Sequence, residues 1–228
     1  MTRNRGLNRA QIAWRAAQDL SAGEYVNLGL GMPVGVANHV PPDRGVFFHA
    51  ENGVVGVGPV ATGDDADPDL VDAGSQTITL VPGAAIVDSV TSFGMIRGGH
   101  LDVTLLGGFE VASNGDLANW DAQTPGKGQL VGGAMDLAVG AKSVRVMMEH
   151  TTKSGDPRLV ERCALPLTGL GVVDRVYTDW AVVDVEPGGF VVREVLGGVS
   201  REALERWTGA PLTFAEDCAD LITPELDD

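Results

Sequence analysis

Cysteine is nearly absent from this sequence of 228 residues, which contains only Cys163 and Cys218. The two lie far apart and form no CxxC pair, so the sequence predicts neither a disulfide framework nor a zinc–thiolate site. Its four histidines also lack the i, i+4 spacing of a helical metal site. We therefore expect no bound metal.

Basic residues are scarce as well. The 16 Lys and Arg are outnumbered by 31 Asp and Glu, which gives a formal net charge of −15. Such a charge repels phosphate backbones and anionic lipids, so roles on nucleic acid or on a membrane surface are excluded. The opening residues 1–6 are basic, but no apolar stretch of signal or membrane-spanning length follows them. We expect a cytoplasmic protein.

Aromatic residues make up only 5 %, whereas apolar residues reach 44 % and glycines number 31. The core is therefore expected to consist mainly of Val, Leu, Ile and Ala, with many tight turns between elements. No repeat or low-complexity linker divides the chain, so residues 1–214 are expected to form one domain. Residues 215–228 form an acidic segment that we expect to fray.

The hydrophobic pattern alternates between helical and strand-like segments. A helix is predicted over residues 8–20, with Asn8 as N-cap and Gln11 three positions later. A strand at 25–30 then enters a glycine turn and a short helix that has Pro33 in its first turn. Further strand-length runs occur at 46–49, 77–81, 101–106, 143–148, 181–185 and 190–195. This pattern predicts an α/β fold with an open, largely parallel sheet flanked by helices, in a Rossmann-like three-layer arrangement.

The densest candidate for chemistry is Glu51, which ends a predicted strand and is followed by Asn52 and Gly53. Ligands bind open α/β sheets beyond the carboxyl ends of their strands, so the position favours function. A glycine-rich turn also lets backbone N–H groups approach a substrate closely. A purely structural turn explains the same pattern, so both interpretations stay open on this motif alone.

Two other glycine pairs precede helical segments. Gly29 and Gly31 do not complete a dinucleotide-binding fingerprint, because Val34 occupies the position of the third glycine. Gly132 and Gly133 precede an apolar helical stretch, where their N–H groups could bind an anion. Close helix packing explains this second pair equally well.

Taken together, eight ordered segments resemble a known family, the beta (B) subunits of the class I CoA-transferases that act on 3-oxoacids and 3-oxoadipate. The similarity spans nearly the whole chain, in segments 27–33, 51–53, 69–74, 80–84, 95–100, 115–120, 131–137 and 166–169. Two positions depart from the family pattern: Ala50 replaces a usual serine, and Ser75 replaces a lysine or glycine.

The resemblance implies a role for each matching residue. Glu51 would be the nucleophile, Asn27 a contact near the thioester or CoA, and Gly133 a backbone donor near the reacting carbonyl. Four further matching positions, Gly29, Gly31, Gly53 and Gly132, would bind CoA or substrate, as would Ser75, which departs from the family pattern. Coenzyme A is then a substrate, and no separate cofactor is expected.

The resemblance also implies a partner, an alpha (A) subunit of comparable size in an A2B2 assembly, and acyl-CoA and small carboxylic acids as substrates. Residues 147–155 and 176–179 look closer to the 3-oxoadipate type than to the acetoacetate type. We therefore expect transfer from succinyl-CoA to 3-oxoadipate through a glutamyl-CoA thioester. Similar folds also occur in sugar-phosphate isomerases and effector-sensing domains, neither of which would form a CoA adduct.

Overall fold

The structure is a computed structural model that describes residues 6–63, 66–124, 126 and 128–227; the basic residues 1–5 lie outside it. The described helices are α1 (Arg9–Gln18), α2 (Ser89–Arg97), α3 (Ala134–Gly140), α4 (Arg201–Trp207) and the 3₁₀ helices η1 (Met32–His39) and η2 (Pro42–Arg44). A small sheet has the order β7 (Leu117–Ala118), β6 (Glu110–Ala112) and β9 (Leu159–Val160).

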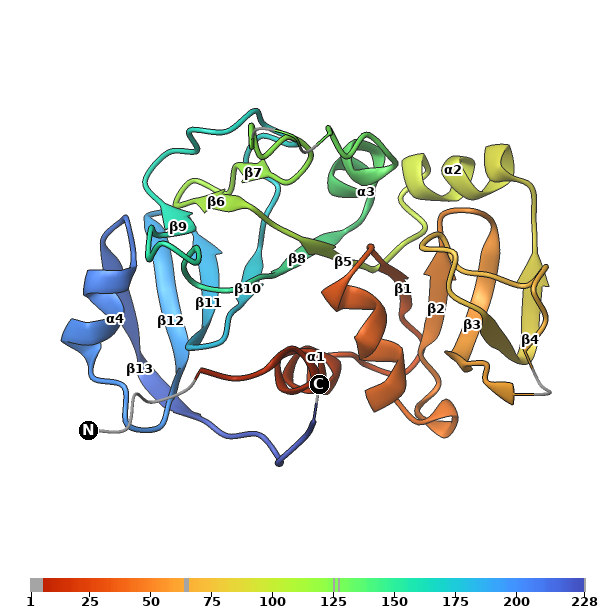
Figure 1. Ribbon diagram of the computed structural model, residues 1–228, viewed down its shortest axis with the longest axis horizontal. Helices are drawn as coiled ribbons and strands as arrows, with labels where there is room; N and C mark the ends of the chain where they lie inside the picture. The colour runs from red at the N-terminus through yellow and green to blue at the C-terminus, as the bar shows by residue number, and fades with distance from the viewer. Residues whose placement is uncertain (1–5, 64–65, 125, 127, 228) are drawn as a thin grey trace.

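A large sheet of ten strands within the described residues runs across the width of the molecule (Figure 1). Its order is β13 (Leu212–Leu221), β12 (Gly189–Leu196), β11 (Ala181–Glu186), β10 (Arg175–Tyr177), β8 (Ser143–Met147), β5 (Val103–Gly107), β1 (Tyr25–Leu28), β2 (Phe47–Ala50), β3 (Val54–Val60) and β4 (Ile78–Ile86). The central strands β10, β8, β5, β1 and β2 are parallel, whereas β3, β4 and β11 pair antiparallel with their neighbours. The predicted parallel sheet is thus confirmed at its centre, with mixed edges.

Helices cover both faces of this sheet, as the α/β prediction requires. In Figure 1, α2 and α3 lie above the sheet and α1 and η1 lie below it. Side chains of α1 and η1 share one hydrophobic cluster with the sheet, and side chains of α2, α3 and α4 share a second one. The central strands are largely buried because helices cover both faces of the sheet, but Asn27, His49 and Thr104 are polar residues among them.

Local signals set the helix boundaries as the sequence predicts. The Asn8 side chain accepts from the Gln11 N–H at 2.8 Å, and the Gln11 side chain accepts from the Asn8 N–H at 3.0 Å. This reciprocal capping box fixes the start of α1. Ser200 caps α4 with a single bond, accepting from the N–H of Ala203 at 3.2 Å.

The expected frayed tail after Phe214 is wrong as far as Leu221, because β13 continues to that residue in parallel pairing with β12. In this segment Phe214, Cys218 and Leu221 are partly or fully buried, whereas Glu216, Asp217 and Asp220 are exposed. Leu221 is 2 % exposed, and the Arg201 guanidinium lies 4.6 Å from the centre of the Phe214 ring. An edge strand whose acidic side chains are exposed to solvent therefore explains the acidic composition.

Candidate active site

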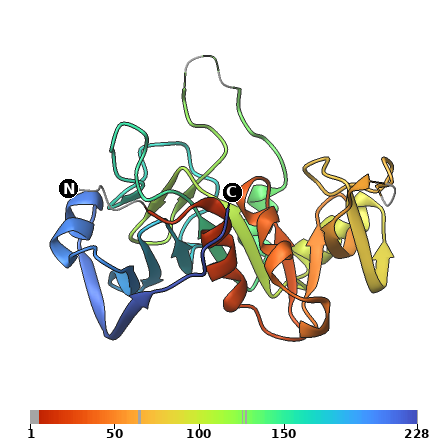
Figure 2. The same cartoon turned by 60° about the horizontal axis from the view of Figure 1, so that its bottom comes forward.

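Glu51 directly follows β2 and lies half-buried on the wall of a pocket of about 590 Å³. The pocket brings together five residues that the sequence nominated: Gly29, Gly31, Glu51, Gly132 and Gly133. They come from the end of β1, the end of β2 and the start of α3, so the parallel strands deliver them to one edge of the sheet. The described parts of the long connection between β7 and α3 stand off the body of the chain (Figure 2), and residues 129–133 line the pocket.

The rest of the pocket wall is mainly apolar, with Leu30, Met32 and Leu106 among its residues. Its basic groups are Arg9 and Arg158. A concave apolar pocket with few polar groups is the usual form of a small-molecule site. The two arginines are not apparent as site residues from the sequence, because they come from α1 and from a loop far away along the chain.

Three effects act on the Glu51 carboxylate. Burial raises its pKa, a hydrogen bond from the Gly133 N–H lowers it, and the negative charge of Asp136 raises it; the net shift is upward. Glu51 therefore holds its proton to a higher pH than an ordinary glutamate, and its ionised form is a correspondingly stronger nucleophile. The Gly133 N–H points at the charge that this carboxylate carries.

Gly133 approaches Glu51 so closely that a side chain at position 133 would overlap the carboxylate where it now lies. A β-carbon built on Gly133 would lie 2.4 Å from Oε2 of Glu51 and 3.0 Å from Cζ of Phe93. On Gly132 the same atom would lie 3.9 Å from Oε1 of Glu51, which is an ordinary contact. A side chain at position 133 would therefore displace the Glu51 carboxylate, although the φ of −75° is itself open to any residue.

Three nominated residues, Asn27, Gly53 and Ser75, do not line the pocket. Asn27 is buried within the sheet at 1 % exposure. Ser75 is exposed in a tight turn with φ +64°, and the neighbouring Gly74 packs beside Leu30 of the pocket wall. Direct contacts of these three residues with CoA stay predictions.

Gly53 instead shapes the turn that follows Glu51. Its φ is +121°, and a β-carbon there would lie 2.0 Å from the Val87 carbonyl oxygen. The N–H of Gly53 donates to the Ala50 carbonyl, and its own carbonyl accepts from the N–H of Val87, each at 2.9 Å. The turn is therefore clamped between β2 and the segment that leads into α2.

Gly53→Ala is expected to destabilise the chain by about 2 kcal/mol or more, because it combines backbone strain with a steric overlap. Gly23→Ala is the matched control. Gly23 also has a positive φ, +87°, but no atom lies within 4 Å of the added carbon, so about 1 kcal/mol is expected. Urea unfolding of both variants measures the difference, and equal losses would show that the Val87 contact contributes nothing.

A set of buried polar residues that the sequence does not reveal lies behind Glu51. His49 Nε2 lies 2.9 Å from Ser92 Oγ, and Ser92 Oγ donates to the Glu51 carbonyl at 2.8 Å. On its other side, His49 Nδ1 lies 3.0 Å from Nδ2 of Asn27. This link is not visible in the sequence, because only the register of β1 against β2 places His49 beside Asn27.

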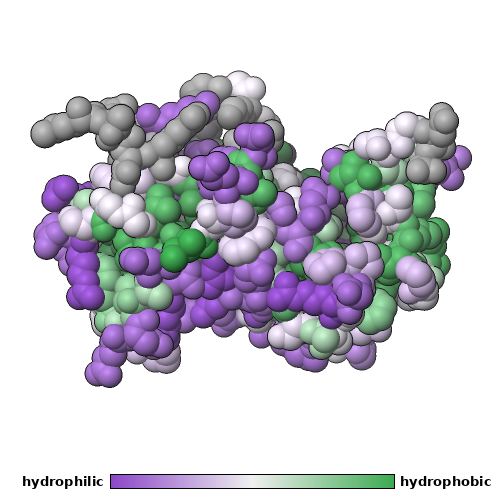
Figure 3. All heavy atoms as spheres, turned by 90° about the horizontal axis from the view of Figure 1, so that it is seen from below, coloured by the Kyte–Doolittle hydropathy of each residue, from purple (hydrophilic) through white to green (hydrophobic). Residues whose placement is uncertain are grey.

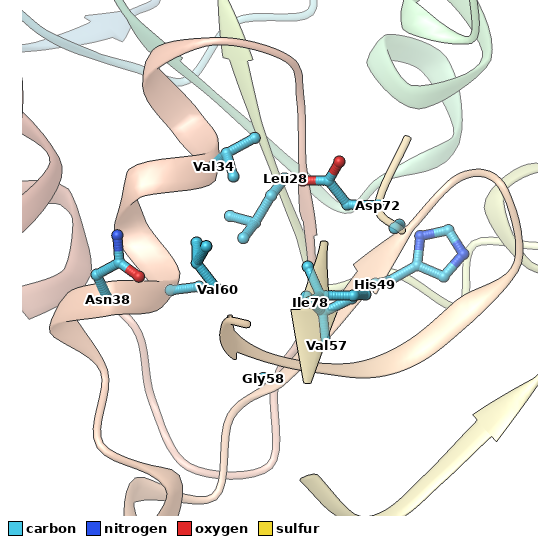
Figure 4. A pocket seen from close by; sticks show the side chains of 11 residues that line it. Leu28, Val34, Asn38, His49, Val57, Gly58, Val60, Asp72 and Ile78 are labelled. Atoms are coloured by element: carbon cyan, nitrogen blue, oxygen red, sulfur yellow. The ribbon is translucent and has the colours of Figure 1, made fainter. Parts of the chain in front are cut away.

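A second cavity lies behind β1, β2 and β3 (Figure 4). Its volume of about 20 Å³ is close to that of one water position, far too small for a CoA ester. Leu28, Val57, Val60 and Ile78 point toward its interior. The cavity is a packing space and holds no candidate chemistry.

Among the described residues, no group of three or more His, Cys, Asp or Glu side chains could hold a metal ion. No helix in the same residues has the length and apolar character needed to cross a bilayer. Cys163 and Cys218 are both free thiols, and burial raises the pKa of Cys163 to about 12, so this thiol is unreactive at neutral pH.

Comparisons with known proteins agree with this geometry. The family model described as Coenzyme A transferase matches residues 9–203. The beta (B) subunit of the 3-oxoadipate CoA-transferase of Acinetobacter baylyi is 48 % identical over 209 residues, 92 % of this chain and 96 % of that protein. The beta (B) subunit of the succinyl-CoA:3-ketoacid coenzyme A transferase of Helicobacter pylori is 47 % identical over 203 residues, 89 % and 97 % of the two chains.

A human relative is longer. The mitochondrial succinyl-CoA:3-ketoacid coenzyme A transferase 2 is 42 % identical over 221 residues, which is 96 % of this chain but 41 % of the human protein. Among solved structures, an acyl-CoA transferase from Escherichia coli O157:H7 matches with a TM-score of 0.74 at 20 % identity, over 94 % of this chain and 43 % of that one. This structural likeness shows the fold, and the sequence matches show that the chain belongs to the coenzyme A transferase family, as a beta (B) subunit.

Proposed function

We propose that this chain carries the nucleophile of a two-subunit transferase that moves CoA from succinyl-CoA to a 3-oxoacid, with 3-oxoadipate as the preferred acceptor. The observation that carries the proposal is the placement of Glu51. Its carboxylate lies half-buried on the pocket wall and accepts from the Gly133 N–H. A half-buried carboxylate in this setting suits covalent catalysis on an acyl thioester.

The chemistry explains why a carboxylate is needed. The Glu51 carboxylate attacks the thioester carbonyl of the donor, which releases CoA thiolate and leaves a mixed anhydride. The thiolate then attacks the glutamyl carbonyl, forming a glutamyl-CoA thioester and releasing the donor acid. A second acid reverses both steps. One thioester is present before and after each half-reaction, so no ATP is consumed.

Two features support a dicarboxylic acid as substrate. The relatives from Acinetobacter baylyi and Helicobacter pylori are named for 3-oxoadipate and for succinyl-CoA with a 3-ketoacid. The pocket also contains Arg9 and Arg158, whose guanidinium groups can bind a carboxylate remote from the reacting centre. Oε1 of Glu149 lies 3.8 Å from Nη2 of Arg9, so Glu149 balances part of the positive charge of Arg9.

An alpha (A) subunit completes the proposed enzyme, as A2B2 in the cytoplasm. Relatives matched over nearly their whole length are named as beta (B) subunits.

Large apolar side chains are exposed beside the pocket, at 49–80 % of their surface: Leu130, Val131, Met135 and Val139. Apolar residues also gather at the end of the molecule formed by β3 and β4 (Figure 3), where Leu80 and Ile86 are exposed. Exposed apolar patches of this kind mark protein interfaces.

The test uses this chain co-expressed with its alpha partner. Incubation with succinyl-CoA should add the mass of CoA, less one water, to this chain, and borohydride should inactivate only the enzyme already exposed to acyl-CoA. Double-reciprocal plots should be parallel, as a ping-pong mechanism requires. Turnover without adduct, or intersecting lines, would contradict the covalent mechanism; a preference for acetoacetate over 3-oxoadipate would contradict the acceptor assignment.

A further inference from the structure

A chain of buried polar side chains leads from the middle of the large sheet to the backbone of Glu51. Thr104 on β5, Asn27 on β1 and His49 on β2 lie at one level of three neighbouring parallel strands. These three side chains, and Ser92 on α2, are at most 1 % exposed. The last link is the bond that Ser92 donates to the Glu51 carbonyl.

The partners fix the direction of each hydrogen bond. Nδ2 of Asn27 lies 3.2 Å from the His49 carbonyl oxygen, which can only accept, so this atom is a donor to Nδ1 of the His49 ring as well. The Oδ1 of Asn27 in turn accepts from Thr104 Oγ1 at 3.3 Å. Nδ1 of His49 is therefore unprotonated, and the ring proton lies on Nε2.

The same logic continues to Glu51. Nε2 of His49 donates to Ser92 Oγ, and the hydroxyl proton of Ser92 then goes to the Glu51 carbonyl. Burial lowers the pKa of His49 to about 4, so the ring stays neutral at physiological pH. Donors aligned in one direction polarise one another and strengthen the last bond in the chain.

We propose that Asn27, His49 and Ser92 are positioning residues that hold Glu51 in its reactive geometry; this inference rests on the function proposed above. Glu51 belongs to a turn, beyond the last ladder pair of β2 with β3. Its carboxylate must meet both the Gly133 N–H and the thioester. A misplacement of about 1 Å at such a centre costs about 100-fold in rate. The bond from Ser92 ties the Glu51 peptide to α2 and to the sheet.

A second histidine provides a matched control within the same chain. His150 is also fully buried, with a pKa lowered to about 4. Its Nε2 lies 2.9 Å from Oγ1 of Thr208, which donates to the Leu204 carbonyl at 2.8 Å. The arrangement of histidine, hydroxyl and carbonyl is the same, but it ends in α4, and neither His150 nor Thr208 lines the pocket.

The experiment compares Ser92→Ala with Thr208→Val in the complex with the co-expressed alpha partner. Each removes one hydroxyl between a buried histidine and a carbonyl, so both should lower the unfolding temperature. Ser92→Ala should also lower kcat and the rate of CoA-adduct formation by about 10- to 100-fold, with KM changed less than about threefold. Thr208→Val should keep kcat within about twofold of the wild type, as expected for a hydroxyl that serves stability alone.

Ser92→Cys keeps a weak donor of similar size, and its kcat should lie between those of the wild type and Ser92→Ala. If the wild-type pair forms the adduct but Ser92→Ala and Thr208→Val have equal kcat, the positioning role is wrong and the proposed function stands. If the wild-type pair forms no adduct with succinyl-CoA, the proposed function and this inference both fall.

Discussion

Glu51→Gln is expected to lower CoA transfer by at least about a thousandfold, because it removes the covalent route rather than one increment of transition-state stabilisation. Glutamine matches glutamate in size and can still accept from the Gly133 N–H, so the packing around α3 should persist. The amide cannot attack a thioester and cannot carry CoA. Steady-state kinetics and intact mass of the co-expressed pair with succinyl-CoA measure the loss and the missing adduct.

Glu149→Gln is the control for this substitution, because Glu149 is another carboxylate of the same pocket. It makes the same change of charge without removing a nucleophile, so a loss of at most about tenfold is expected. The Glu51→Gln protein must be fresh and checked by mass, since deamidation would regenerate glutamate. If deamidation-free Glu51→Gln kept its rate within about tenfold of the wild type, Glu51 would not be the nucleophile.

The sequence predicted the part of the site that depends on local signals. Glu51 and the glycines were found because they lie where strands end and helices begin, and the parallel order of β1, β2 and β5 brings such ends together. The same reasoning located most elements of the large sheet to within a few residues. Capping at Asn8 and Ser200 was readable because it depends on side chains within three positions of the helix start.

Features that depend on register were not readable. Asn27 contacts His49, which is 22 residues away in the sequence, and Thr104, which is 77 residues away. Only the register of the three strands brings these pairs into contact. Ser92 reaches Glu51 because α2 packs across the end of β2, a tertiary contact that no periodicity shows. The strand β13 was missed because exposed acidic residues of an edge strand look the same, in sequence, as a solvated tail.

The sequence also does not show that Gly133, and not Gly132, faces the Glu51 carboxylate. This placement leads to a prediction with a large effect. Gly133→Ala is expected to lower kcat by about 100-fold, because the new methyl group would overlap Oε2 of Glu51. Either the carboxylate must turn away or α3 must shift. Both movements lengthen the hydrogen bond from the N–H of residue 133 to the Glu51 carboxylate.

The pH dependence distinguishes this loss from general damage. The Gly133 N–H lowers the pKa of Glu51, while burial and Asp136 raise it. Weakening that bond leaves the raising effects unopposed, so the pKa of Glu51 rises further in Gly133→Ala. A nucleophilic carboxylate must be ionised, and the acid limb of the kcat/KM profile should therefore move to higher pH.

Gly132→Ala isolates the cause, since it adds the same methyl group one residue earlier, where 3.9 Å separates it from Oε1 of Glu51. Its effect on kcat should be at least tenfold smaller than that of Gly133→Ala, because no overlap has to be relieved. Unfolding temperatures of the two variants should be similar, as neither position requires a positive φ. Equal losses of kcat, or an acid limb that stays in place in Gly133→Ala, would mean that the Gly133 N–H does not hold the Glu51 carboxylate during the reaction.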